Sequence, residues 1–288
     1  MKCASTIKLS SRATEEFWEI PVLYEDEHLL ALDKPSGLLI SPDRNDPERP
    51  NLMKLLHGGI AQNKPWAKER GLSYLMNAHR LDFEISGVIL LAKSKPVLVQ
   101  LANLFGSEKP AKKYGALVQG QPANDEFESD AKLAPHAANP AIIRVDTKRG
   151  KRALTRFKVR ERFEGWTWIE CRPLTERTHQ IRVHLKSLGL PMVGDALYGG
   201  KALWLSRLKS DYRLKPNHEE RPLIGRLALH AEELVLPHPV GGRVVSIEAP
   251  LPKDIEVGLK YLRRYAPSQM TKPECRNPKQ ARSSNKSR

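Results

Sequence analysis

The chain has 288 residues, enough to bury a hydrophobic core in one large domain or two ordinary ones. Its 48 basic and 33 acidic residues give a net charge of +15, and the isoelectric point is near 9.8. Such a charge indicates a polyanionic partner, nucleic acid first and an anionic membrane surface second. Residues 271–288 carry six Lys or Arg and one Glu, so about two thirds of the excess lies elsewhere on the chain.

Three cysteines, Cys3, Cys171 and Cys275, lie far apart, which excludes a disulfide framework and a CxxC metal site. This usage is typical of a reducing compartment, so we expect a cytoplasmic protein. No apolar run approaches the roughly 20 residues of a membrane helix, and residues 1–14 lack the apolar stretch of a signal peptide. Their acid-free, Ser/Thr-rich composition also fits an organelle transit peptide, an alternative that the ordered-looking residues 17–20 disfavour.

The first predicted element is a strand–turn–strand unit in residues 24–40, where Pro35-Ser36-Gly37 has the composition of a β-turn. Apolar periodicity and turn residues then predict a series of short elements. In chain order these are a polar loop at 43–50, a helix at 52–60, a buried strand at 87–92, a helix at 95–106 and a strand at 112–120.

The second half of the chain reads as a hairpin, a helix and two late strands. The predicted ranges are strands 144–162 and 166–172, helix 177–189, and strands 228–236 and 243–249. Adjacent strands with few inserted helices favour an α+β class over an alternating α/β class. We expect a largely antiparallel mixed sheet flanked by helices, divided into an N-terminal extension (1–20), a globular domain (21–266) and a basic, disordered tail (267–288).

Several motifs that would supply other chemistries are absent from the sequence. It has no GxxxxGK[ST] loop, no GxGxxG after a strand, no HExxH and no GxSxG. His179 and His184 are five residues apart, about 140° around a helix of roughly 3.6 residues per turn, so they are poorly placed to share a metal ion. We therefore expect neither a metal nor a small-molecule cofactor.

Five segments together resemble the RluA-type family of RNA pseudouridine synthases, in the family's order. They are YEDEHLLALDKPSGLLI, HRLDFEISGVILLAKS, KKYGALVQG, RTHQIRVHLKSLGLPMVGDALYGG and LALHAEELVLPHP. The resemblance covers most of residues 22–252. It implies a pseudouridine synthase catalytic fold with a central active-site cleft, cofactor-free isomerisation of uridine in ribosomal or transfer RNA, and a base flipped out of its stack. No N-terminal S4-like module is apparent.

The same resemblance implies three catalytic residues. Asp82 is the expected catalytic aspartate, acting as a nucleophile or stabilising a developing sugar cation. Arg177 is its expected partner, a guanidinium that keeps the acid ionised. Tyr114 is expected to stack on the uracil and to place its hydroxyl for proton transfer at carbon 5. By itself, an aspartate before a strand is more often a turn former.

Four further residues are expected at the substrate: His79, Arg80, His179 and Leu229. Arg80 and His79 would line the cleft and either contact the phosphate of the extruded nucleotide or fill the space that it vacates. Leu229 would pack against the target ring. For His179 a structural role is the alternative. The run 148–162 holds eight Lys or Arg against one Glu, and we expect it to contact RNA phosphates rather than form a solvated face.

The sequence departs from the family pattern at two positions. Ile85 stands where Thr or Ser is usual, which removes a hydroxyl that could bind the catalytic loop. Glu176 stands where Gly is usual, and it could compete with Asp82 for Arg177 or cap the following helix. Neither change removes a catalytic group.

The rival prediction is a non-catalytic RNA-binding or RNA-chaperone protein on the same fold. An acid in a phosphate-attracting cleft would weaken RNA binding, so Asp82 favours an enzyme. A DNA-binding regulator would need a helix-turn-helix or zinc pattern, which the sequence lacks. The enzyme is expected to act on RNA as a monomer, away from membranes.

Overall fold

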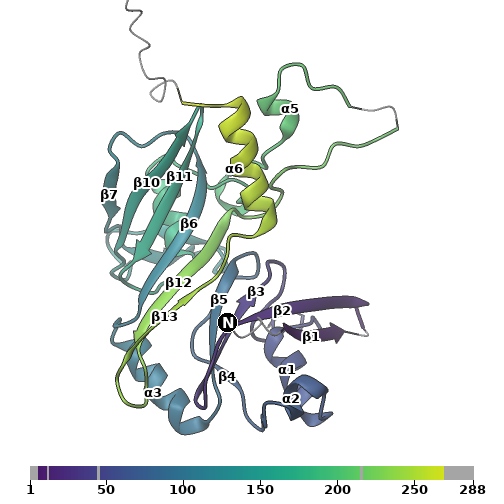
Figure 1. Cartoon of the computed structure of the whole chain (residues 1–288). Helices are drawn as coiled ribbons and strands as arrows, with labels where there is room; N and C mark the ends of the chain where they lie inside the picture. Colours follow the sequence, from purple (N-terminus) through teal and green to yellow (C-terminus); the bar gives the residue numbers. More distant parts are fainter. Residues whose placement is uncertain (1–5, 12, 44–45, 215–216, 269–288) are drawn as a thin grey trace, which may run out of the picture.

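The computed structural model describes residues 6–11, 13–43, 46–214 and 217–268. These residues form an α+β fold, in which helices flank one large mixed sheet (Figure 1). The predicted class and the largely antiparallel sheet are therefore confirmed. Among the described residues, no helix has the length and apolar character needed to cross a membrane. The structure describes residues 267 and 268 of the predicted tail. The rest of the tail, from residue 269 onward, lies outside the described residues.

The N-terminal half supplies five strands and three helices. The strands are β1 (Thr6–Ser11), β2 (Glu16–Glu25), β3 (Leu29–Lys34), β4 (Met76–Asn77) and β5 (Ser86–Ala92). The helices are α1 (Leu52–Ala61), α2 (Pro65–Lys68) and α3 (Lys95–Gly106). The bounds of α1, β5 and α3 agree closely with the predicted elements, whereas α2 and β4 were not predicted.

The C-terminal half supplies the remaining elements. Its strands are β6 (Ala111–Gln119), β7 (Glu126–Ser129), β8 (Leu133–Pro135), β9 (Ile143–Val145), β10 (Thr155–Phe163), β11 (Trp166–Pro173), β12 (Leu229–Pro237) and β13 (Val244–Glu248). Its helices are α4 (Gln180–Ser187), a 3₁₀ turn η1 (Ala196–Tyr198), α5 (Leu205–Leu208) and α6 (Lys253–Tyr265).

The strand order joins the two halves through a late strand. The described strands run β1-β2-β3-β5-β12-β6-β11-β10-β7, with β4 on β5 and β13 on β12. The pairing of β12 with β5 is parallel, and the other pairings in this sheet are antiparallel. A Cβ on Gly87 would lie 2.2 Å from the carbonyl oxygen of Ala231, so only glycine permits this close approach of β5 to β12.

Side chains on alternate positions of the strands bury two faces of the sheet. Leu30 and Leu32 pack on the face covered by α1, α2 and α4, whereas Leu29 and Ala31 pack on the face covered by α3 and β13. Further along that second face, α6 covers Leu117 and its neighbours. The N-terminal and C-terminal strands therefore form one continuous sheet with buried apolar side chains on both faces.

The predicted boundary between an N-terminal extension and the domain falls inside β2. Strand β1 pairs with β2 in register from Thr6↔Pro21 to Ser11↔Glu16. The side chains of Ile7, Leu9 and Ile20 are buried in the same hydrophobic cluster as α1. Residues 6–20 thus extend the sheet and its core.

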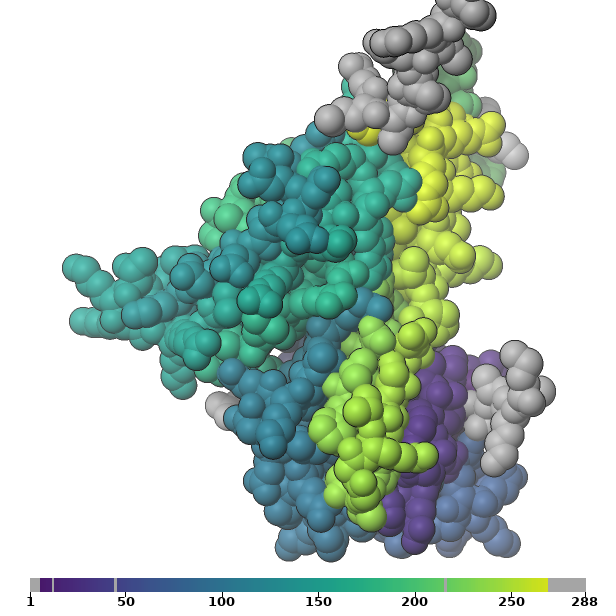
Figure 2. All heavy atoms as spheres, turned by 60° about the vertical axis from the view of Figure 1, so that its left-hand side comes forward, coloured from purple at the N-terminus to yellow at the C-terminus, as the bar shows by residue number. Residues whose placement is uncertain are grey.

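Residues 130–153, which we call the arm, form a small unit outside the large sheet. Its strands β8 and β9 pair only with each other among the described strands. In Figure 2 the teal residues of this stretch project from the body of the molecule. The single strand predicted at 144–162 is therefore wrong in its first half, because residues 144–153 belong to the arm and only β10 continues the sheet.

Candidate active site

A cleft of about 1050 Å³, including its open mouth, lies where the two halves of the sheet meet. Its lining comes from four segments that are distant in sequence. They are residues 78–85 before β5, Lys112 and Tyr114 on β6, residues 173–182 leading into α4, and Leu229 at the start of β12. All seven predicted site residues are among the lining residues.

Asp82 lies on a tight loop that ends in β5. The amide of Ile85 donates to the carbonyl of Asp82 at 3.2 Å, which closes the loop. Three donors of the 34–37 turn bind carbonyl oxygens of this loop: Lys34 Nζ at 3.2 Å and Gly37 N at 2.9 Å to Phe83 O, and Ser36 Oγ at 2.7 Å to Glu84 O. The loop is thus held by the predicted turn, although residue 85 has no hydroxyl.

Lys34 is a buried cation beneath this loop. Its ammonium also donates to Pro35 O at 2.9 Å and Leu38 O at 2.8 Å, so three carbonyls accept its three hydrogens. Burial lowers the pKa of Lys34 to about 7, although the nearby charge of Asp82 acts in the opposite direction. The turn and the Asp82 loop are therefore joined by one buried side chain.

The guanidinium beside Asp82 belongs to Arg182, on α4, and not to Arg177 as predicted. Arg182 Nη1 lies 3.4 Å from Asp82 Oδ2. The rest of the guanidinium binds Asp195 through two hydrogen bonds of 2.9 and 2.8 Å, and it lies 5.0 Å from the centre of the Tyr198 ring. Bidentate pairing with a buried carboxylate fixes the orientation of Arg182.

Arg177 lies on the same cleft but is directed elsewhere. Its Nε donates to the carbonyl of Arg152 on the arm at 3.0 Å, and Nη1 donates to the carbonyl of Glu176 at 3.0 Å. Its Nη2 is 3.9 Å from Glu108. Four residues lie between Arg177 and Arg182, and only Arg182 is on α4, whose first turn faces the Asp82 loop. Arg177 therefore joins the arm to the rim of the cleft.

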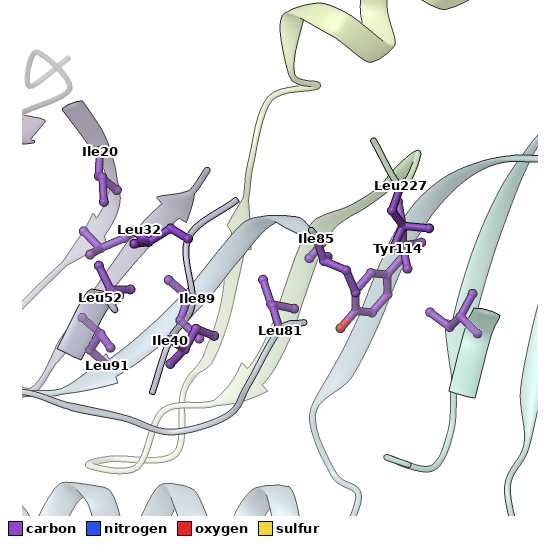
Figure 3. Close-up of a cluster of buried hydrophobic side chains, with 14 of the residues drawn as sticks. Ile20, Leu32, Ile40, Leu52, Leu81, Ile85, Ile89, Leu91, Tyr114 and Leu227 are labelled. Carbon is purple, nitrogen blue, oxygen red and sulfur yellow. The ribbon is translucent and has the colours of Figure 1, made fainter. Parts of the chain in front are cut away.

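Apolar side chains form one wall of the cleft. Figure 3 shows Ile85 beside the ring of Tyr114, in the same buried cluster as Leu229. Burial raises the pKa of the Tyr114 hydroxyl, and the negative charges of Glu176 and Asp82 raise it further. Tyr114 consequently keeps its proton at neutral pH. The wall offers a flat apolar surface next to a carboxylate.

Glu176 pairs with Lys112, on β6, at 2.7 Å. It neither competes with Asp82 for Arg177 nor caps α4, which begins only at Gln180. The start of α4 is held instead by Gln180, whose amide oxygen accepts from the amide of Arg177 at 3.1 Å. Both effects expected for Glu176 are therefore wrong.

His79 and Arg80 differ in their surroundings. The ring of His79 stacks on Phe105 with ring centres 5.0 Å apart, and its Nε2 accepts a hydrogen bond from the amide of Leu90 at 3.1 Å. Burial lowers the pKa of His79 to about 3, so the ring is neutral. These contacts favour a structural role for His79. Arg80 is exposed at the cleft and forms no ion pair with a described residue.

His179 lies between Asp82 and the arm. Its Nε2 is 3.6 Å from Asp82 Oδ2, and its Nδ1 is 2.8 Å from the hydroxyl of Tyr198. The same hydroxyl accepts from the amide of Ile143 in β9 at 3.0 Å. His179 is therefore in contact with the predicted catalytic residue.

Sequence reasoning missed three residues that shape the site: Lys34, Arg182 and Asp195. Each is a charged residue at most 5% exposed, within segments that are otherwise largely apolar. Charges are buried in proteins when they are paired or hydrogen-bonded. A single charged residue within an apolar stretch, such as Arg182 in 181–185 or Asp195 in 192–195, therefore indicates a buried ion pair.

The arrangement combines a carboxylate, a fixed guanidinium and an apolar wall, and this agrees with three comparisons with known proteins. Residues 28–187 match the family model described as RNA pseudouridylate synthase. The ribosomal large subunit pseudouridine synthase D of Xanthomonas campestris is 34% identical over 265 residues, which cover 89% of this chain and 73% of the relative.

A second relative is the ribosomal large subunit pseudouridine synthase C of Salmonella typhi. It is 35% identical over 247 residues, covering 85% of this chain and 70% of the relative. Among solved structures, human RNA Pseudouridylate Synthase Domain Containing 4 superposes with a TM-score of 0.63 at 23% identity, covering 84% of this chain and 92% of the human chain. The last comparison shows a shared fold.

Proposed function

Because the chain belongs to the RNA pseudouridylate synthase family and is thus an isomerase acting on RNA, we propose that Asp82 is its catalytic residue and Arg182 the charge partner of Asp82. The observation that carries this proposal is the position of the carboxylate. It is 27% exposed, at a cleft with an apolar wall, and lies 3.4 Å from a guanidinium that is itself fixed by Asp195.

The reaction breaks the bond between the sugar and N1 of uracil and forms a bond to carbon 5. The proton lost from carbon 5 balances the proton gained by N1, so neither oxidant nor phosphate donor is required. A flipped-out uracil would pack against Tyr114, Ile85 and Leu229. The Asp82 carboxylate would then act as nucleophile or stabilise the developing sugar cation.

For Tyr114 we propose both ring contact and proton relay. Its raised pKa disfavours a phenolate base at neutral pH. The hydroxyl can accept the proton from carbon 5 only while it passes its own proton to a neighbouring group. We therefore expect Tyr114→Phe to lower kcat strongly while RNA affinity is retained.

Exposed cations around the cleft would bind the RNA backbone. Arg80 lies at the cleft, and Arg177 connects the cleft to the arm, where Lys148, Arg149, Lys151 and Arg152 are exposed. Contacts of this kind supply affinity that depends on salt concentration and not on base identity. The basic rim supports binding of a structured RNA whose target base enters the cleft.

We propose ribosomal large-subunit RNA as the substrate, because the two relatives above are named for it. Ribosomes reside in the cytoplasm, so we place the enzyme there. We also propose that the enzyme acts as a monomer. Transfer RNA is the alternative substrate.

The test is pseudouridine mapping of cellular RNA from strains that carry the wild-type gene, Asp82→Asn or Asp211→Asn. Asp211 is an exposed surface aspartate and serves as the matched control. We expect one or more large-subunit uridines to lose modification only with Asp82→Asn. A modification retained in that strain would contradict the assignment of Asp82, and a loss confined to transfer RNA would contradict the proposed substrate.

A further inference from the structure

Four groups form a continuous chain of polar contacts that leads from the arm to Asp82. The amide of Ile143 contacts the hydroxyl of Tyr198 at 3.0 Å, and this hydroxyl contacts His179 Nδ1 at 2.8 Å. His179 Nε2 then lies 3.6 Å from Asp82 Oδ2. The last distance exceeds a direct hydrogen bond, but catalytic hydrogen bonds commonly shorten in the complex with substrate.

The direction of the hydrogen bonds in this chain of contacts follows from its first group, the backbone amide of Ile143. A backbone amide can only donate, so the oxygen of Tyr198 accepts from Ile143. The hydroxyl proton of Tyr198 then has one acceptor among the described residues, which is His179 Nδ1. A neutral imidazole that accepts at Nδ1 carries its proton on Nε2, the nitrogen that faces Asp82.

The opposite direction would leave two groups unsatisfied. If Nδ1 carried the proton, the Tyr198 hydroxyl would have no acceptor among its described contacts. Nε2 would also direct a lone pair at the carboxylate of Asp82, which is repulsive. One tautomer of His179 therefore satisfies every contact in the chain.

We propose that His179 is a positioning residue, which uses a tautomer fixed by Tyr198 to orient the carboxylate of Asp82. The inference rests on the proposed catalytic role of Asp82. Arg182 Nη1 and His179 Nε2 both approach Oδ2. The other oxygen, Oδ1, forms no hydrogen bond or ion pair with a described residue and is thus directed to the substrate.

The backbone at His179 supports this role. His179 precedes α4 with φ +53° and ψ +20°, a left-handed conformation that is unfavourable for a residue with a Cβ. This conformation places the ring between Tyr198 and Asp82. Asparagine tolerates left-handed conformations better than most residues, which makes His179→Asn a suitable test variant.

Burial favours the neutral form of the His179 ring. Burial lowers the pKa of His179; Asp82 and Asp195 act to raise it, whereas Arg182 and Arg80 lower it further. A neutral ring is required, because a protonated imidazole would donate from both nitrogens and lose the bond from Tyr198. The tautomer can therefore be measured directly near neutral pH.

The first experiment is nitrogen NMR of the histidine rings in the full-length protein, with His179 assigned by the disappearance of its signals in His179→Asn. We expect His179 in the Nε2–H form at pH 7, and a mixture of tautomers in Tyr198→Phe. An Nδ1–H form in the wild-type protein would overturn the proposal, whatever the activity of the variants.

The second experiment compares two substitutions at position 179. Asparagine ends near the position of Nδ1, whereas the amide nitrogen of glutamine can reach that of Nε2. We expect His179→Asn to lower kcat about 10- to 100-fold, the size of a positioning defect, with unchanged Kd for RNA. His179→Gln should recover part of this activity.

Tyr198→Phe should lower kcat in the same direction, and adding it to His179→Asn should cause little further decrease, since both changes interrupt one chain. A wild-type kcat in His179→Asn, or a defect confined to RNA affinity, would overturn the proposal. If either result is obtained while Asp82→Asn is inactive in the same assay, only the proposed role of His179 is contradicted. An active Asp82→Asn would instead contradict the proposed function.

Discussion

The basic run 148–162 crosses two regions of the molecule that use the same kind of residue differently. On β10, all four cations pair with acids: Arg156 with Glu128, Lys158 with Glu126, Arg160 with Glu170 and Glu232, and Arg162 with Asp125. On the arm, Lys148, Arg149, Lys151 and Arg152 are exposed and form no ion pair with a described residue. A charge count along the sequence does not distinguish these two regions.

The difference arises from what lies beside each segment. Strand β10 lies between β7 and β11, whose acidic side chains face its cations across the sheet. The nearby acid in the arm, Asp146, has other partners, since Oδ1 accepts from the amides of Lys148 and Arg149 and Oδ2 pairs with Arg144 at 2.9 Å. The four unpaired arm cations therefore remain available for a polyanion, whereas the β10 cations stabilise the fold.

The largest effect in this comparison is expected at Arg160. Its guanidinium contacts Glu232 at 2.6 and 2.7 Å and Glu170 at 2.9 Å, and both carboxylates are mostly buried. Removing one partner leaves buried charge uncompensated, so Arg160→Ala should lower the free energy of unfolding by on the order of 3 kcal/mol, measured by urea denaturation. RNA affinity of the folded protein should not change.

A neutral network provides the control for this variant. Arg160→Met combined with Glu170→Gln and Glu232→Gln removes the charges together and should restore much of the stability. If Arg160→Ala instead weakened RNA binding without affecting stability, the division between the two regions would be contradicted.

The next largest effect is expected on the arm. Replacing Lys148, Arg149, Lys151 and Arg152 by alanine should weaken RNA binding about 10- to 100-fold at moderate salt, measured by fluorescence anisotropy. The slope of log Kd against log salt should fall by roughly 0.7–0.9 for each phosphate that the variant no longer neutralises. The free energy of unfolding should be unchanged, because these side chains are exposed. An unaltered salt dependence would show that the arm does not contact RNA.

A pH effect is expected where the arm meets β10. His184 is buried, and its nitrogens contact Thr155 Oγ1 and Ala131 O, both at 3.0 Å. Burial lowers the pKa of His184, although the Ala131 carbonyl and Asp130 oppose the shift. The folded protein thus binds fewer protons than the unfolded chain. The stabilising contribution of His184 is complete above its unfolded pKa of about 6.5 and is lost as pH falls through the lower folded value.

Hydrogen exchange of the 130–133 amides, corrected for intrinsic rates, measures this effect at the root of the arm. Protection should fall between pH 7 and pH 5 in the wild-type protein and change less in His184→Gln, which cannot titrate. Equal pH dependence in both proteins would assign the effect to other groups.

The smallest effect is expected for Arg156→Ala with Lys158→Ala. Both cations and their acidic partners are more than half exposed, and exposed pairs contribute little to stability. Removing two cations from β10 should leave the RNA affinity and the unfolding midpoint indistinguishable from wild type. A weakening of binding comparable to that of the arm variant would show that β10 also contacts RNA.

The elements that the sequence predicted well have strong local signals. The run Gly87–Ala92 is uniformly apolar and became the buried strand β5, and Pro96 and Gly106 lie at the two ends of α3. The arm was not predicted because its turn depends on packing between residues that are distant in sequence. A Cβ on Gly150 would lie 2.3 Å from Asp146 O and 2.7 Å from Lys132, a constraint that periodicity does not contain.

The candidate site shows the same limit. Asp82, Tyr114 and Leu229 were expected at one cleft through family resemblance, and the structure places them there. The resemblance assigned the role of charge partner to Arg177, and the helix predicted at 177–189 began three residues before α4. Which end of a helix faces a distant loop is decided by tertiary packing.

The insertion of β12 between β5 and β6 has a consequence for synthesis of the protein. Residues 82 and 114 are made early, but the strand that joins their two half-sheets begins only at Leu229. A ribosome-bound chain that has not yet released β12 has the parts of the cleft without the strand that assembles them. The two half-sheets that carry Asp82 and Tyr114 can therefore be joined only after most of the chain has been synthesised.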